Sequence, residues 1–206
     1  LKGESVRQIT VFVCDASYDS ARAVADLQAA LNVERVIALQ QQPEPEQWES
    51  TMAHARCRPV AKTLIGPGCT AKLSPSAQLT ALDCSAGGQF NSSSCVVRLS
   101  YKGKSLLYVS ELDAAGEAGL VSSGCVLESN ILALGRGADH NNPSLELLSR
   151  VRPQTCVLCT RRPWSSVVKR LSPENSGATL FRTDKDGIIE IVTDGRSVQS
   201  SAGGGQ

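Results

Sequence analysis

The stretch NSSSCVVRLSYKGKSLLYVSELDAAGE, residues 91–117, decides the fold. Residues 94–101 alternate between apolar and polar side chains, Lys102-Gly103-Lys104 is a tight turn, and residues 106–109 are nearly all apolar, which together predict a β-hairpin. Ser110-Glu111-Leu112-Asp113 then ends the second strand and opens a helix. In α/β proteins the chemistry usually lies where a strand ends, so the carboxylates at this point mark the first candidate site.

On both sides of this hairpin, strands and helices alternate along the chain. Before it, we expect a strand at residues 6–14, a helix from Ser20 to about Asn32, a strand at 33–39, a helix at 47–57 and strands at 60–65, 69–73 and 78–84. After it, we expect a helix at 113–121, a strand at 130–134, a helix through Val151 with Pro143 in its first turn, a strand at 154–160 and a helix at 164–171. Residues 178–183 and 187–193 predict a closing hairpin, and the low-complexity residues 197–206 predict a disordered tail. This order favours an α/β sandwich whose helices lie outside.

The composition limits the class of protein. Of 206 residues, 41% are hydrophobic, which is enough for a sizeable core, and we expect one domain over residues 1–196. The net charge of +1 gives no global case for binding nucleic acid or a membrane surface. No run reaches the roughly 18 apolar residues of a membrane-spanning helix, and the first residues do not resemble a signal peptide. Because the sequence begins with Leu1 rather than Met, we expect a piece of a longer protein.

Eight cysteines are spread along the chain, and only Cys156 and Cys159 have the C-x-x-C spacing. No second pair and no histidine pair completes a zinc site, and these two cysteines lie in an apolar segment that predicts a buried strand. We therefore expect scattered structural thiols, with one or two disulfides or a zinc site as the alternatives.

Four passages, taken in order, resemble a known family. They are VRQITVFVCDASYDSARAVADLQAALNVERVIAL at 6–39, SSSCVVRLSYKGKSLLYVSELDAAGEAGL at 92–120, ILALGRGADHNNPSLELLSRVRPQTCVL at 131–158, and RRPWSSVVKRL with GATLFRTDKDGIIEI at 161–171 and 177–191. Their order and spacing are similar to those of the metallo-β-lactamase-fold domain at the C-terminus of ComEC-type DNA-uptake (competence) proteins. The resemblance implies a metallo-β-lactamase-like αββα sandwich, here without the family's first strands.

The family binds zinc or manganese through five histidines and two aspartates at loop tips, and this sequence departs from that pattern. The family's H-x-H-x-D-H segment is similar to residues 14–20, which contain no histidine. Its Gly-Asp pair falls on Ser110-Glu111, its His-His-Gly-Ser on residues 136–139, and its last histidine on Arg162. Only two histidines, His54 and His140, occur in the whole sequence. We therefore expect a degenerate domain with no catalytic residues and no bound zinc or manganese.

Charged residues at these positions suggest a vestigial site. Its members would be Asp15, Asp19, Glu111, Asp139, His140, Arg136 and Arg162. Our hypothesis is that the two guanidinium groups replace the lost metal charge and pair with the carboxylates. Two alternatives stay open: the residues are solvated loop ends, or the carboxylates hold Mg²⁺ or Mn²⁺ with His140 as a base.

Basic residues are concentrated late in the chain. Residues 136–170 contain seven Lys or Arg against two Asp or Glu, a net charge of +5 in a chain whose total is +1. This segment predicts a phosphate- or DNA-contacting patch made of Arg152, Arg161, Arg162, Trp164, Lys169 and Arg170. The alternative is a set of solvated helix faces whose charge is compensated by acids elsewhere.

Three classes of function remain open. The first is a non-catalytic, pseudo-hydrolase domain of a bacterial competence protein, with a structural or DNA- or partner-binding role. The second is a divalent-metal-dependent nuclease or hydrolase with a remodelled oxygen-ligand site, and the third is an unrelated α/β interaction domain. The resemblance implies the first, with DNA or the membrane channel part of the same protein as the partner. It also implies an extracytoplasmic place on a bacterial inner-membrane protein, and the sequence sets no oligomeric state.

Overall fold

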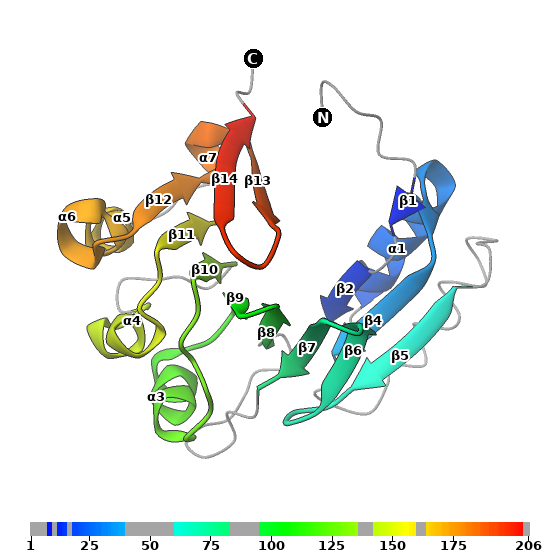
Figure 1. Cartoon of the computed structure of the whole chain (residues 1–206), viewed down its shortest axis with the longest axis horizontal. Helices are drawn as coiled ribbons and strands as arrows, with labels where there is room; N and C mark the ends of the chain where they lie inside the picture. Colours follow the sequence, from blue (N-terminus) through cyan, green and yellow to red (C-terminus); the bar gives the residue numbers. More distant parts are fainter. Residues whose placement is uncertain are drawn as a thin grey trace. The chain divides into compact units, whose positions relative to one another are not determined.

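The computed structural model describes residues 8–9, 12–15, 18–39, 60–82, 95–135, 142–159 and 164–203. The chain divides into two compact units, Leu1–Cys69 and Thr70–Gln206, whose elements are labelled in Figure 1. The single domain predicted for residues 1–196 stays a prediction. The helix predicted at residues 47–57 lies outside the described residues.

The first unit contains a parallel sheet and one helix. Its three strands are β2 (Phe12–Asp15), β4 (Arg35–Leu39) and β5 (Ala61–Ile65), in the order β2-β4-β5, and a short pair joins β1 (Gln8–Ile9) to β3 (Asn32–Val33). The helix α1 (Tyr18–Ala30) buries Ala21 and Val24 against Val33 and Val36. It begins two residues before Ser20, where the sequence predicted its start, so Ser20 lies inside the helix and does not cap it. Several residues before the helix can act as caps, and the apolar spacing alone does not choose among them.

The second unit is built on a seven-stranded sheet with the order β12-β11-β10-β9-β8-β7-β6. Its strands are β6 (Thr70–Ser74), β7 (Ala77–Ala81), β8 (Cys95–Tyr101), β9 (Lys104–Ser110), β10 (Ile131–Leu134), β11 (Thr155–Leu158) and β12 (Thr179–Arg182). Strands β6 to β9 pair in antiparallel fashion, and β9 to β12 pair in parallel. The four parallel strands therefore all end at one edge of the sheet.

The hairpin predicted from residues 91–117 is confirmed as β8 and β9. The two turn residues, Lys102 and Gly103, both have positive φ values, 45° and 84°. Such two-residue turns match the right-handed twist of the flanking strands, which is why they favour glycine. Along β9, alternate residues are buried, so that Leu107 and Val109 face the main core.

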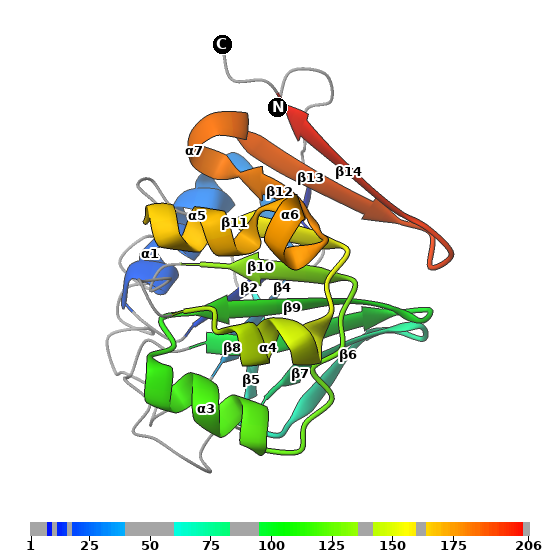
Figure 2. The ribbon, with the colours of Figure 1, turned by 90° about the vertical axis from the view of Figure 1, so that its left-hand side faces the viewer.

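The helices of the second unit lie over one face of its sheet, as Figure 2 shows for α3 (Ala114–Ser122), α4 (Leu145–Val151), α5 (Ser165–Leu171) and α6 (Pro173–Ser176). The strands contribute alternate aliphatic side chains to this core, and α3, α4 and α5 each contribute one apolar stripe. The fully buried residues of the core include Leu107, Leu132 and Leu158 from the strands and Leu120, Leu147 and Leu171 from the helices. On the opposite face, Ile131, Ala133 and Val157 pack against apolar residues of the hairpin formed by β13 (Ile188–Thr193) and β14 (Val198–Gly203). Both faces of the parallel strands are thus covered by apolar residues, as such strands require.

Two predictions for the end of the chain were wrong. β12 does not form a hairpin with β13, because Thr183–Asp186 makes a helical turn, α7, and β12 pairs in parallel with β11. The partner of β13 is β14, so the residues expected to form a disordered tail from 197 onward contain a strand as far as Gly203. A neighbouring strand supplies backbone hydrogen bonds, and these can order a Ser- and Gly-rich segment whose side chains alone would not.

Pro143 also lies elsewhere than predicted. Ser144 is the N-cap of α4, and its side chain accepts a hydrogen bond from Leu147 N at 3.0 Å. Pro143 therefore precedes the helix, in a cis peptide bond with Asn142, instead of occupying the first turn.

Candidate functional site

The edge where the parallel strands end is the candidate site, and β9 delivers its first residues. Glu111 follows β9 with a φ of 53°, in the left-handed region that non-glycine residues seldom occupy. The chain then turns into α3, whose N-cap is Asp113. The Asp113 carboxylate accepts a hydrogen bond from Gly116 N at 2.7 Å. This carboxylate therefore neutralises the positive end of a helix.

The end of β10 packs closely against the end of β9. Gly135 N donates to Val109 O at 2.8 Å. A Cβ atom on Gly135 would lie 2.6 Å from the hydroxyl oxygens of both Ser110 and Tyr108. Protein side chains thus fill the space beside Gly135, and only a residue without a Cβ fits there.

Behind this edge, buried polar groups tie three segments together. Asn142, which is 6% exposed, donates from Nδ2 to Leu112 O at 2.6 Å. Glu117, which is 4% exposed, accepts a hydrogen bond from Ser144 N at 2.7 Å. Arg170 of α5 donates from Nη1 to Pro143 O at 2.8 Å. The loop after β9, the start of α4 and the end of α5 are therefore joined by direct hydrogen bonds.

Neither Glu117 nor Asn142 was predicted from the sequence to belong to the site. A signal for Glu117 was present, because it lies three and four residues before Leu120 and Val121 and so shares the apolar face of α3. A carboxylate on such a face needs a buried partner. The signal for Asn142 was weaker, since an Asn before a Pro is typical of any turn.

A second group of charged residues lies at the end of β12, and it was not predicted from the sequence as part of a site. Arg182 pairs with Asp184 through two hydrogen bonds of 3.0 Å and 2.5 Å, and Arg182 N donates to Asp186 Oδ2 at 2.7 Å. The hydrogen bond from Arg182 lowers the pKa of Asp184 below its usual value, and Asp184 in turn raises the pKa of Arg182. β12 lies three strands from β9, which is roughly 14 Å at the usual strand spacing of about 4.8 Å. The acids at the ends of β9 and β12 are therefore too far apart to bind the same ion.

The structure describes only three of the seven residues of the predicted vestigial site. Asp15 ends β2 and Asp19 lies in the first turn of α1, both in the first unit, whereas Glu111 belongs to the second. The remaining members, Arg136, Asp139, His140 and Arg162, lie outside the described residues. Their convergence, and the pairing of guanidinium groups with carboxylates, stay predictions.

The predicted phosphate patch is divided between two helices. Trp164, Lys169 and Arg170 all belong to α5 or its N-cap, with Trp164 half exposed, Lys169 exposed and Arg170 bound to the Pro143 carbonyl. Arg152 instead caps the C-terminus of α4. Arg161 and Arg162 lie outside the described residues.

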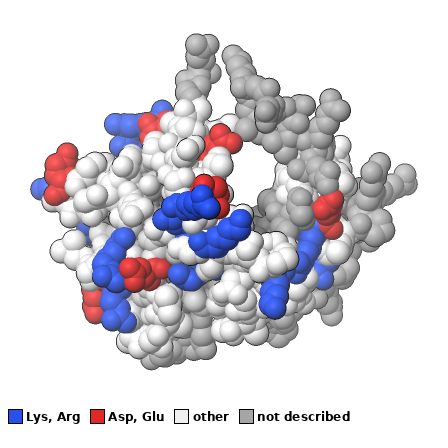
Figure 3. Space-filling view, viewed as in Figure 1, with Lys and Arg blue, Asp and Glu red and all other residues white. Residues whose placement is uncertain are grey.

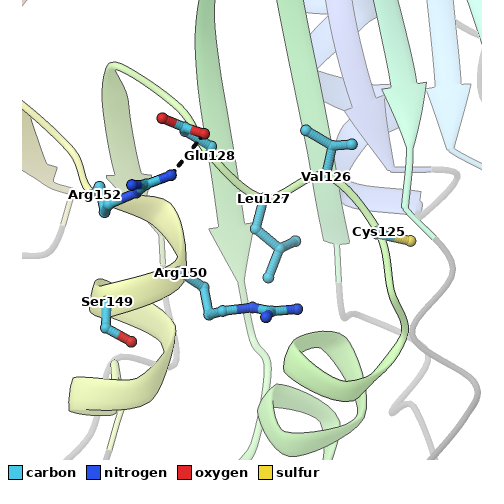
Figure 4. Close-up of a pocket in the computed structure, with 7 residues that line it drawn as sticks. All are labelled: Cys125, Val126, Leu127, Glu128, Ser149, Arg150 and Arg152. Carbon is cyan, nitrogen blue, oxygen red and sulfur yellow. Dashed lines mark ion pairs between the residues drawn. The ribbon is translucent and has the colours of Figure 1, made fainter.

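Arg152 lines a pocket of about 360 Å³ between α4 and residues 125–128, shown in Figure 4. It forms an ion pair of 2.8 Å with Glu128, and both side chains are about two-thirds exposed (67% and 64%). Arg150 passes below Leu127 and donates to Val121 O at 3.3 Å, near the end of α3. An exposed pair of this kind contributes at most about 1 kcal/mol, so Arg152 can exchange Glu128 for another anion at little cost.

The residues present do not fit the metal centre that the resemblance implies. Among the described residues, no group of three His, Cys, Asp or Glu side chains lies close enough together to hold a metal ion. Two carboxylates near the ends of β9 and β12 are already engaged, Asp113 by Gly116 N and Asp184 by Arg182. Two histidines in the whole sequence cannot supply the five of the family.

Five cysteines form no disulfide: Cys69, Cys95, Cys125, Cys156 and Cys159. Burial raises the pKa of Cys156 to about 12 and also raises that of Cys159. Because a cysteine binds zinc as the thiolate, this burial disfavours zinc binding by the C-x-x-C pair. Cys95 and Cys156 are buried, as the prediction of structural thiols requires, whereas Cys69 is exposed. In the described part of the chain, no helix combines the length and the apolar character needed to cross a membrane.

The sequence matches no family model and no curated protein, but the solved structures that are similar to the chain include PqqB and Igni18. Zn²⁺-bound PqqB from Methylobacterium extorquens is 11% identical, with a TM-score of 0.50 over 84% of this chain and 71% of its own. Igni18, a metallo hydrolase from the hyperthermophilic archaeon Ignicoccus hospitalis KIN4/I, is 10% identical, with a TM-score of 0.51 over 93% of this chain and 78% of its own.

These neighbours have the metallo-β-lactamase fold, and the chain has that α/β fold, with a large mixed sheet and helices. The fold class predicted from the sequence is therefore confirmed. At identities near 10% the likeness concerns the fold alone, and the ComEC-type assignment stays a prediction.

Proposed function

We propose that this chain is a non-catalytic metallo-β-lactamase-like domain of a bacterial competence protein, with a structural or DNA- or partner-binding role. One observation carries the proposal: on this fold, three described carboxylates at or behind the strand ends are bound by groups of the protein itself. Asp113 accepts a hydrogen bond from Gly116 N at the start of α3, Glu117 accepts one from Ser144 N at the start of α4, and Asp184 pairs with Arg182. The sequence contains only two histidines, and neither stands at a position that matches one of the family's five, which supports the same conclusion.

The partner and location of the domain belong to the same proposal. The resemblance to ComEC-type proteins supports a place in the extracytoplasmic part of an inner-membrane protein, beside its channel. A structural role would then lie in supporting the channel. A binding role would lie in contacting the incoming DNA through the exposed basic residues of α5 and α4.

Elemental analysis of the purified protein tests the loss of metal. We expect less than about one-tenth of an equivalent of zinc or manganese after purification in buffers supplemented with each ion, and no divalent-dependent cleavage of single- or double-stranded DNA. Stoichiometric metal together with such cleavage would refute the proposal in favour of a hydrolase with a remodelled oxygen-ligand site.

Fluorescence anisotropy with labelled DNA tests the binding role. We expect binding that weakens steeply between about 50 and 200 mM salt, because each phosphate contact releases counterions. The triple variant Arg161→Ala/Arg162→Ala/Lys169→Ala should bind more weakly and with a shallower salt dependence. Lys185→Ala, an exposed charge on α7, is the matched control and should behave like the wild type. If the triple variant and the control bind DNA equally well, DNA binding through these residues is refuted. The structural or partner-binding role then remains.

A further inference from the structure

A second pocket lies at the opposite edge of the seven-stranded sheet from the strand ends described above. It occupies about 250 Å³ where β6 turns into β7 and where β8 turns into β9. Six of its lining residues are polar or charged: Lys72, Ser74, Ser76, Gln78, Ser100 and Lys102. No Asp or Glu lines it, so the pocket offers hydrogen-bond donors and positive charge to whatever enters.

The strands around this pocket concentrate positive charge. In residues 70–82 and 95–110, which contain β6 to β9, there are four Lys or Arg and no Asp or Glu, a net charge of +4 in a chain whose total is +1. Figure 3 shows Lys and Arg side chains gathered near the middle of one face, with Asp or Glu side chains beside them, over the region where Figure 1 draws β8, β9 and the β13–β14 turn. The residues of β6 to β9 thus carry a local excess of positive charge.

Two hydroxyl groups of the pocket are set up as donors. Ser100 Oγ accepts a hydrogen bond from Arg98 Nη1 at 2.7 Å. Ser74 Oγ accepts one from Ser76 N at 3.3 Å. A serine hydroxyl has one proton to donate besides its acceptor lone pairs, so each of these groups can accept the N–H bond and still donate to a ligand. The guanidinium behind Ser100 also strengthens that hydroxyl as a donor.

The stem of Lys102 is held in place before any ligand binds. Its backbone N donates to Ser76 O at 3.4 Å, and its Nζ lies 5.0 Å from the centre of the Tyr101 ring. The β13–β14 turn packs so closely on it that a Cβ atom on Gly195 would collide with the Lys102 side chain. An ammonium group fixed in this way loses less side-chain entropy on binding an anion than a free surface lysine does.

Asp194 lies on the β13–β14 turn, which packs on Lys102, and its carboxylate is hydrogen-bonded within that turn. Asp194 accepts hydrogen bonds from Arg196 N at 2.7 Å and Ser197 N at 2.8 Å, within its own turn. These bonds lower the pKa of Asp194, so it is ionised at neutral pH. Its Oδ1 atom is thus directed to the backbone N–H groups of residues 196 and 197.

We propose that the pocket binds a phosphoryl group. A tetrahedral oxyanion needs donors on several sides, and here two ammonium groups, two hydroxyl donors and one side-chain amide surround a space large enough for it. The phosphoryl group can belong to free phosphate or pyrophosphate, or to the backbone of a nucleic-acid strand, because both present the same oxygens. This inference does not depend on the proposed function, since the pocket lies at the other edge of the sheet.

The test is a titration of the ¹⁵N-labelled full chain at constant ionic strength, followed by NMR. One arm adds inorganic phosphate and then pyrophosphate, and a separate arm adds a short oligodeoxythymidylate without terminal phosphates. We expect saturable shifts of the amides at Ser74, Ser76 and Ser100 to Gly103 in at least one arm. The double variant Lys72→Gln/Lys102→Gln should bind the same probe about tenfold more weakly or worse, the loss expected for a charge-assisted hydrogen bond. Lys185→Gln removes one charge outside the pocket and should bind as the wild type does.

The two arms separate the sources of the phosphoryl group. Shifts with phosphate or pyrophosphate identify a small-anion site, and shifts with the oligonucleotide alone identify a phosphodiester site. The proposal is overturned if neither probe shifts these amides, or if the double variant, with an otherwise unchanged spectrum, binds as tightly as the wild type. Should that variant fail to fold, Ser74→Ala is the second test, and an unchanged affinity would overturn the proposal equally.

Discussion

The buried carboxylate of Glu117 gives the sharpest test of how the strand-end edge is held together. It is 4% exposed and accepts a hydrogen bond from Ser144 N at 2.7 Å, where α4 begins. A hydrogen bond to a charged group contributes about 1.5–3 kcal/mol. Truncation to alanine also removes a buried methylene worth about 0.8 kcal/mol. We therefore expect Glu117→Ala to lower the free energy of unfolding by about 3 kcal/mol, a large part of the stability of a typical domain.

Two further variants separate the charge from the acceptor. Glu117→Gln keeps an oxygen that can accept from Ser144 N but loses the charge, and we expect a cost of about 1 kcal/mol. Glu146→Ala removes an exposed charge from the first turn of α4 and serves as the matched control. It should cost less than about 1 kcal/mol, because it changes only the interaction with the helix dipole.

Urea unfolding and hydrogen exchange measure these differences independently. For slopes of about 1–3 kcal/mol/M, a loss of 3 kcal/mol moves the urea midpoint by about 1–3 M. Exchange of the Ser144 amide should accelerate about a hundredfold in Glu117→Ala, since each 1.4 kcal/mol is a factor of ten. The reasoning is refuted if Glu117→Ala and Glu146→Ala agree within about 0.5 kcal/mol and the Ser144 amide exchanges at the same rate in both.

Four other outcomes follow from the geometry. The pKa of Asp184 is lowered by its hydrogen bond from Arg182, so this carboxyl stabilises the fold above the unfolded pKa of about 3.9 and loses that effect as pH falls through the lower folded pKa. Arg182→Ala should raise the pKa of Asp184 in a carboxyl NMR titration between pH 2 and 5, and an unchanged titration would contradict the pairing. Burial raises the pKa of Cys156 to about 12, so iodoacetamide at pH 8 should modify exposed Cys69 in the native chain but modify Cys156 only after unfolding, as read by peptide mass spectrometry. Gly195→Ala should destabilise the chain by about 1–2 kcal/mol, because a side chain is strained at a φ of 89° and collides with its neighbour, and an unchanged melting temperature would show that the turn packs differently. Prolonged dialysis against EDTA should leave the melting temperature within about 1 °C, and a drop of several degrees would show that a metal stabilises the fold.

Local patterns in the sequence were sufficient to predict much of the second unit. The turn at Lys102-Gly103, the strands on either side of it and the helix that Asp113 opens all follow from turn chemistry, alternation and capping within a few residues. The strand β14 could not be predicted in this way. Its Ser- and Gly-rich sequence has little strand preference, and its order comes from backbone pairing with β13.

The candidate site was harder to predict than the fold, because its decisive bonds join residues far apart in the sequence. Glu117 and Ser144 are 27 residues apart, and Leu112 and Asn142 are 30 residues apart. No periodicity links such positions, and a single sequence gives no information on which distant groups meet. The loops predicted to carry Arg136, Asp139, His140 and Arg162 lie outside the described residues, so their part in the site remains a prediction.

The two edges of the seven-stranded sheet have opposite chemistry, and this contrast bears on what the fold can do without a metal. A metal centre requires several anionic or neutral donors that converge and have no other partner. At the edge where β9 ends, backbone N–H groups already occupy the Asp113 and Glu117 carboxylates, and they give these acids the stabilisation that a cation would otherwise supply. At the other edge, the residues of β6 to β9 include four cations and no acid, and serine hydroxyls line a pocket. Binding a cation to Asp113 or Glu117 at the first edge would compete with bonds that hold α3 and α4 in place, whereas at the second edge Lys and Ser side chains match an anion. The described framework therefore favours the capture of an anion over the capture of a metal ion.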